Sequence, residues 1–232
     1  NNHTIIESLN PYMIYSHKIL ELTNKINIKK NCNKIIIKLN NNLIQINDND
    51  KLFWFFYICK YDFESYLNLN NNKFLVEKHM KIDSINESKK NKNLLKDNKI
   101  KISEYESNLL NDTIISLKTL KGLCIFNNLS ILIIEGKKYF DFDFGVNKNV
   151  IFKNNNNIGM ELNVSLEKIN DYKKNKLLIN NLDRNLKGVS SYKVSELKDI
   201  CLKLNINFLD NTNKVKKKDT LYREILETIN SN

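Results

Sequence analysis

The chain has 232 residues, of which 41% are hydrophobic and 27% are charged, and it carries a formal net charge of +11. This length allows one substantial core and a small second module, because domains usually comprise about 100–150 residues. The longest apolar runs, such as residues 52–59, are far shorter than the roughly 20 residues that cross a bilayer, so we expect no membrane span and no membrane partner.

In the first quarter of the chain, a helix is expected after Pro11, because apolar residues recur there at helical spacing. Two short apolar segments, 34–39 and 43–46, flank an Asn-rich turn and predict a β-hairpin. Asp48 or Asp50 is then placed to cap a strongly hydrophobic helix. These features favour a domain that contains both helices and strands.

The hydrophobic helix is predicted over residues 51–66, and its crowd of aromatic side chains marks it as the central core helix. Another helix is expected over 74–85, followed by an exposed Lys/Asn-rich stretch to residue 99. Residues 103–106 read Ser-Glu-Tyr-Glu, which is the capping-box pattern, and they predict a helix over 104–110.

A further helix is expected over 116–126, and a strand hairpin follows it. The strands cover 129–135 and 138–144, joined by a Gly136-Lys137 turn, and the second strand alternates apolar and polar residues. Shorter strands are expected over 150–152 and 160–164. This order of elements predicts an α+β fold with an N-terminal domain of helices and antiparallel strands.

Candidate catalytic chemistry is sparse in this domain. Asp141 and Asp143 project from one face of a predicted strand, where a metal-binding carboxylate pair is one interpretation and a solvated edge is the favoured one. The five glycines are isolated and form no phosphate-binding loop. The sequence therefore predicts no catalytic residue, no metal site and no cofactor.

The cysteines bear on a possible thiol enzyme. An opening helix, a later helix and a strand hairpin are the broad layout of papain-like cysteine peptidases, in which a Cys begins the helix and a His lies on a strand. Here residues 51–55 contain no Cys and 129–164 contain no His, so an inactive relative is the remaining form of this alternative. The four cysteines form no C-x-x-C pair, which argues against zinc and favours a reducing compartment: Cys32, Cys59, Cys124 and Cys201.

The C-terminal part has a different pattern. Residues 192–204 and 219–229 each place apolar side chains on one helical stripe, and a polar loop joins them. Twelve Lys and Arg but only four acidic residues lie between 173 and 218, a surplus of eight. A basic helix pair of this kind is typical of nucleic-acid binding.

This region resembles a SAP-type module, a helix–extended loop–helix motif that binds DNA. The resemblance depends on the apolar positions of the first helix and on Lys218 opening a Leu-containing second helix. Asn205 stands where the family has a turn glycine, and Asn tolerates the left-handed conformation. The loop 206–217 is longer than in the family.

The chain as a whole is similar, more loosely, to a family of uncharacterised proteins of large eukaryotic DNA viruses. The strings that suggest this are Leu-Phe-Trp-Phe-Phe-Tyr-Ile at 52–58, the helix start at 115–120, and Ser-Tyr-Lys-Val-Ser-Glu-Leu at 191–197. The high content of Asn, Lys and Ile, whose codons are AT-rich, fits such a virus and equally a protist with an AT-rich genome.

The sequence therefore predicts an α+β domain (1–170), a charged linker (171–185) and a SAP-like helical module (186–232). The expected function is binding of nucleic acid, with DNA favoured over RNA, in the nucleus, the cytoplasm or a viral factory. The alternatives are a helix pair that docks on a protein surface and the inactive papain-like relative. The residues expected to contact phosphates are all lysines: Lys193, Lys198, Lys203, Lys216, Lys217 and Lys218.

Overall fold

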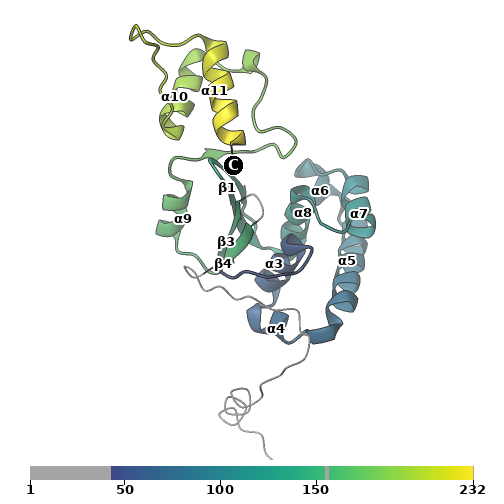
Figure 1. Ribbon diagram of the computed structural model, residues 1–232. Helices are drawn as coiled ribbons and strands as arrows, with labels where there is room; N and C mark the ends of the chain where they lie inside the picture. The colour runs from purple at the N-terminus through teal and green to yellow at the C-terminus, as the bar shows by residue number, and fades with distance from the viewer. Residues whose placement is uncertain (1–42, 155–156, 232) are drawn as a thin grey trace, which may run out of the picture. The chain divides into compact units, whose positions relative to one another are not determined.

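The computed structural model describes residues 43–154 and 157–231 (Figure 1). The helix predicted after Pro11 and the strand predicted over 34–39 lie outside this part of the chain. The partner segment 43–46 forms no hairpin strand within it. Instead, Ile44 makes a single antiparallel bridge to Met160, with backbone N···O distances of 2.7 and 2.9 Å.

The central helix α3 covers Lys51–Lys60, and Asp50 caps it by accepting a hydrogen bond from a first-turn backbone N–H at 3.1 Å. Residues 52–58 are all buried, which confirms the predicted core helix. The helix ends earlier than predicted because Asp62 caps a separate short helix, α4 (Phe63–Leu67). One cap residue therefore divides the predicted helix in two.

The next helices extend further than the sequence suggested. A short 3₁₀ turn, η2 (Asn70–Asn72), leads into α5 (Lys73–Lys90), and α6 covers Lys92–Asp97. The stretch predicted to be exposed up to residue 99 is thus mostly helical, and it contributes the fully buried Leu95 to the core. Packing of this side chain offsets the weak helix propensity of the Asn residues around it.

The predicted capping box is wrong. Helix α7 covers Ile102–Asn111, so Ser103 lies inside its first turn rather than at its start. The following helix, α8 (Leu117–Asn127), begins as predicted, because Ser116 caps it by accepting a hydrogen bond from the Thr119 N–H at 3.1 Å. Helices α5, α7 and α8 pack around α3 in one hydrophobic cluster.

The strands form one five-stranded sheet in the order β4-β3-β1-β2-β5. Antiparallel pairs are β1 with β2 and β3 with β4, whereas β1 with β3 and β2 with β5 are parallel. The α+β class is confirmed, but the sheet is mixed rather than antiparallel. The strands are β1 (Ser130–Glu135), β2 (Lys138–Phe142), β3 (Lys148–Asn154), β4 (Asn157–Glu161) and β5 (Leu177–Leu178).

A loop over residues 143–147 is the reason for the parallel β1–β3 pair, because it carries the chain past the start of β1. Ser130 Oγ fixes this loop by accepting hydrogen bonds from the Phe144 and Gly145 N–H groups at 3.0 and 2.7 Å. A Cβ atom at Gly145 would lie 2.0 Å from the carbonyl oxygen of Asn128, so only glycine fits there.

The sheet has two covered faces (Figure 1). The inner face packs against helices α3 to α8, and its members include Ile131, Ile133, Phe140, Phe142 and Ile151. The outer face packs against α9 (Leu166–Lys173) and includes Leu132, Ile134, Tyr139 and Val150. The main core therefore lies between the inner face and α3.

The C-terminal residues form the predicted helix pair, α10 (Val194–Leu204) and α11 (Lys218–Asn230), preceded by a 3₁₀ turn, η3 (Val189–Ser191). Both apolar stripes meet in a core of their own, except that Val194 is 39% exposed. That core consists of Leu186, Leu197, Cys201, Leu204, Leu221, Ile225 and Ile229. The region predicted as a linker also contains the end of α9 and strand β5.

Candidate nucleic-acid interface

The helix pair positions the six lysines that the sequence singled out. Helix α10 begins after Lys193, whose backbone N–H donates to the Glu196 carboxylate at 2.6 Å. Lys198 follows on the same helix, and neither lysine has an acidic partner within 4 Å among the residues described. Helix α10 ends at Asn205, which adopts the left-handed conformation (φ 59°) expected of it.

Lys203 lies in the last turn of α10, and its ammonium group lies 5.8 Å from the centre of the Tyr139 ring on β2. A cation over an aromatic ring is attracted by the negative face of the ring. Leu177 of β5 also packs against the core of the helix pair. This end of α10 is therefore in contact with the sheet.

Lys216 has a structural role. Its Nζ lies 2.9 Å from both carboxylate oxygens of Glu224 and donates to the Asn207 carbonyl oxygen at 2.8 Å. These bonds tie the end of the loop to α11. Of the six lysines, Lys216 is the one that the ion pair already partly neutralises.

Lys217 and Lys218 lie at the start of α11, where Lys217 is the N-cap residue and makes no side-chain cap bond. The first N–H groups of a helix have no partner inside the helix, and the helix dipole adds partial positive charge there. Asp219 lies in the same turn. The start of α11 thus combines two lysines without acidic partners and uncapped N–H groups, which together favour an anion.

The long loop between the helices is ordered by Asp210. Its Oδ1 accepts hydrogen bonds from the Thr212 and Lys214 N–H groups at 2.8 and 3.0 Å, and Leu209 bridges to Val215 on the returning strand. Hydrogen bonds, first from Thr212 and then from Lys214, hold the pKa of Asp210 below its usual range. The long loop is therefore a defined turn that leads into α11.

Charge within the helix pair is more balanced than the sequence window suggested. Residues 186–232 contain nine basic and six acidic residues, a surplus of three, because α11 contributes acids that follow residue 218. Three of the surplus of eight come from residues 173–185, which precede the helix pair. One of those residues, Lys173, is already bound to Asp141 at 2.6 Å.

Asp141 and Asp143 do not form a metal-binding pair or a simple solvated edge. Asp141 is half-buried, and its two carboxylate oxygens each lie 2.6 Å from an ammonium group, one from Lys148 and one from Lys173. Burial alone would raise the pKa of Asp141, but these two lysines hold it below its usual range. The side chain of Asp143 accepts a hydrogen bond from Ser130 Oγ at 2.9 Å. Asp141 therefore fastens α9 to the sheet.

None of the thiols that the structure describes is activated as a peptidase nucleophile would be. Cys59 lies near the end of α3, not at its start, and its Sγ lies 3.6 Å from Met160 Sδ. Burial raises the pKa of the Cys59 thiol to about 12, so it stays protonated at neutral pH. Burial also raises the pKa of Cys201. The only histidine among the described residues is His79, on α5.

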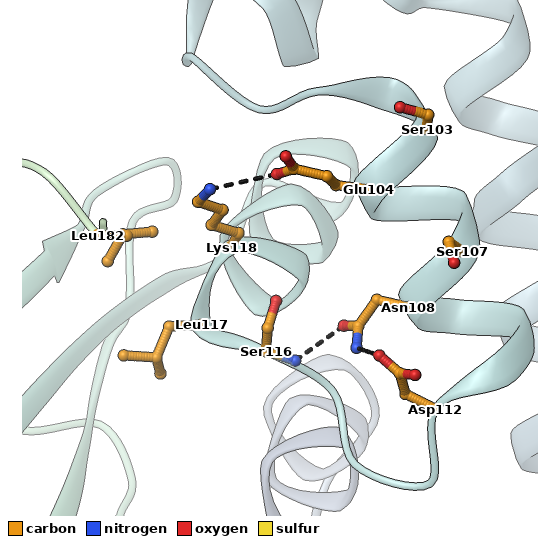
Figure 2. A pocket seen from close by; sticks show the side chains of 9 residues that line it. All are labelled: Ser103, Glu104, Ser107, Asn108, Asp112, Ser116, Leu117, Lys118 and Leu182. Carbon is orange, nitrogen blue, oxygen red and sulfur yellow. Dashed lines mark hydrogen bonds and ion pairs between the residues drawn. The ribbon is translucent and has the colours of Figure 1, made fainter.

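An open pocket of about 650 Å³ lies between α7 and the start of α8 (Figure 2). Its polar groups bond mainly to each other: Asn108 Oδ1 accepts from the Ser116 N–H at 2.8 Å, Asn108 also donates to Asp112, and Lys118 lies 3.2 Å from Glu104. Figure 2 shows the bonds of Asn108 to Ser116 and of Glu104 to Lys118 linking the two helices. The side chains that line the pocket therefore hold α8 against α7.

Two findings bear on the class of protein. In the part of the chain that the structure describes, no helix is long and apolar enough to cross a membrane. No protein-family model matches the sequence, and comparisons with curated proteins and with solved structures find no significant match.

Proposed function

We propose that the chain binds nucleic acid, with DNA favoured, through the SAP-like helix pair α10–α11. The observation that supports this is the contrast in ion pairing. Of the nine Lys and Arg residues between 186 and 231, only Lys216 lies within 4 Å of a carboxylate. Between 43 and 185, nine of 22 basic residues do. Ammonium groups without carboxylate partners are the ones available to phosphates.

Two structural features favour a polyanion at this surface. Phosphate binding by lysines releases condensed counterions, which gives affinity without base-specific contacts. The uncapped start of α11, next to Lys217 and Lys218, offers backbone N–H groups to a phosphate in addition. We therefore expect binding with little sequence preference and a steep dependence on salt.

The test is a charge reversal at the start of α11 in the full chain, K217E/K218E. Acidic residues are favourable at a helix N-terminus, so the helix should stay folded. The matched control is K89E/K90E, which makes the same change in net charge at two exposed lysines of α5 that have no acidic partner among the described residues.

We expect fluorescence anisotropy with labelled duplex DNA to show at least a tenfold loss of affinity for K217E/K218E and a much smaller loss for the control. No binding by the wild-type chain at low salt would overturn the proposed function. Equal losses in both variants would show attraction to overall charge only, and would overturn the assignment to α11.

A second candidate is that the helix pair is a docking module for the protein's own domain. Leu177 packs against both the main core and the core of the helix pair, and Lys203 contacts Tyr139. A chain ending at residue 185 separates the two candidates. If docking is the function, this chain should lose several degrees in Tm, whereas a nucleic-acid module should leave the Tm nearly unchanged.

A further inference from the structure

Two lysines lie side by side at one end of the sheet. Strands β2 and β5 are parallel, with Tyr139 opposite Leu178, and the Leu177 N–H donates to the Lys137 carbonyl oxygen at 2.8 Å. One residue earlier in this register, Lys176 comes next to Lys137. Burial, and then the nearby ammonium group of Lys137, lower the pKa of Lys176.

A third lysine reaches the same place from the helix pair. Lys137 is the second residue of the Gly136-Lys137 turn, two positions before Tyr139, which lies on β2. Lys203 of α10 lies over the Tyr139 ring at 5.8 Å. The β1–β2 turn, the segment before β5 and helix α10 therefore each place a lysine at this end of the sheet: Lys137, Lys176 and Lys203.

The acid nearest to this group on the outer face is already engaged. Asp141 follows Tyr139 on the same face of β2, but both of its oxygens contact ammonium groups, those of Lys148 and Lys173. Its charge is thus shared between two other lysines. It forms no ion pair with Lys137, Lys176 or Lys203.

The other acid at this end of the sheet is on the opposite face. Glu135 pairs with Lys138 across the hairpin, and its carboxylate lies 3.8 Å from Lys138 Nζ and 3.3 Å from Lys153 Nζ. Side chains alternate along a strand, so Glu135 and Lys138 lie on the face opposite to Ile134 and Tyr139. Glu135 is therefore already paired with other lysines, and no described carboxylate lies within 4 Å of Lys137, Lys176 or Lys203.

We propose that Lys137, Lys176 and Lys203 each contact a phosphate group of the nucleic acid that the helix pair holds, which extends the binding surface onto the end of the sheet. This inference depends on the proposed function. Like charges on neighbouring strands are unfavourable, and an anion between them removes that repulsion. Lys203 belongs to both α10 and this trio, so it joins the two parts of the surface.

The test is the double variant K137Q/K176Q in the full chain, measured by fluorescence anisotropy with labelled duplex DNA between 50 and 200 mM salt. Each lost phosphate contact lowers the slope of log K against log salt by about 0.9, so two contacts lower it by about 1.8. Over this fourfold range, the variant should therefore lose about 12-fold less affinity than the wild type does. The matched control, K89Q/K90Q, should keep the wild-type slope.

The outcomes separate this inference from the proposed function. A wild-type slope in K137Q/K176Q, together with weaker binding by K217E/K218E, overturns the inference and leaves the proposed function standing. A reduced slope in K137Q/K176Q with unchanged binding by K217E/K218E supports the site at the sheet and overturns the assignment to α11. An equal fall of slope in K89Q/K90Q, or no binding by the wild type, overturns the inference. A Tm no lower than wild type shows that K137Q/K176Q is folded.

Discussion

Asp141→Asn tests how α9 is fastened to the sheet. The Asp141 carboxylate lies 2.6 Å from the ammonium groups of both Lys148 and Lys173, and Lys173 belongs to α9. The amide keeps the shape of the carboxylate but removes its charge. Both ammonium groups then lose their main counter-charge, although Lys148 keeps Asp143 at 3.5 Å. We therefore expect α9 to be held less firmly and the domain to unfold more easily.

The expected cost follows from the burial of this ion pair. The Asp141 side chain is 19% exposed, and those of Lys148 and Lys173 are 10% and 25% exposed. Breaking a fully buried ion pair costs about 3–5 kcal/mol, whereas an exposed pair contributes about 0–1 kcal/mol. Because solvent partly screens the Asp141 ion pairs, we expect their loss to cost about 2 kcal/mol. For a chain of this size, that free energy corresponds to a fall in Tm of about 4–8 °C.

The effect should depend on pH in one direction. Because the lysines hold the pKa of Asp141 below its usual range, its contribution to stability is complete above the unfolded-state pKa of about 3.9. That contribution is lost as the pH falls through the lower pKa of the folded state. Urea unfolding should therefore show the full difference between wild type and Asp141→Asn at pH 6 and a much smaller one near pH 3.

The matched control is Asp143→Asn, two residues further along. Its side chain is 68% exposed and lies 3.5 Å from the same Lys148, so its replacement should cost much less than that of Asp141. Equal costs for the two variants would refute the role given to the buried pair. A cost for Asp141→Asn that stays constant down to pH 3 would refute the electrostatic reasoning.

Three further predictions concern packing, backbone space and the loop before α11. Leu221 is fully buried, so Leu221→Ala should lower the unfolding free energy of the helix pair, measured by hydrogen exchange, by about 2–5 kcal/mol. Leu202 is 59% exposed, so Leu202→Ala should change this free energy little. Gly145→Ala should lower the Tm sharply, since its Cβ would meet a carbonyl oxygen at 2.0 Å, whereas the nearest atom at Gly188 is 3.9 Å away and Gly188→Ala should be tolerated. Lys216→Gln should lower the Tm but change DNA affinity little, because the ammonium group is held by a carboxylate at 2.9 Å. A variant with an unchanged Tm and clearly weaker DNA binding would contradict this structural role.

The sequence predicted those elements whose signals are local. Asp50 caps the core helix as expected, the hairpin turns at Gly136 with a positive φ of 55°, and the apolar stripes of the helix pair meet in one core. Each of these depends on residues within a few positions of one another. Such patterns are predictive because the residues that create them are close in sequence and therefore stay close in the folded chain.

Features that depend on distant residues were not predictable from the sequence. The parallel pairing of β1 with β3 requires the loop held by Ser130, and strand β5 has only two residues, too few for a periodic signal. The proximity of Lys137 and Lys176 follows from that short strand. The candidate phosphate site at the sheet was therefore hidden in a segment that the sequence presented as a linker.

The charges along the sequence and the ion pairs in the structure indicate different sets of lysines for phosphate binding. The sequence window attributed a surplus of eight to the helix pair, yet residues 186–232 have a surplus of only three. What distinguishes the helix pair is that its lysines, apart from Lys216, lack carboxylate partners among the described residues. A phosphate gains most from ammonium groups that no carboxylate already neutralises, because only those release counterions in full. By this criterion, Lys137 and Lys176 belong with the lysines of α10 and the start of α11, whereas Lys173 and Lys216 belong to the framework that holds them.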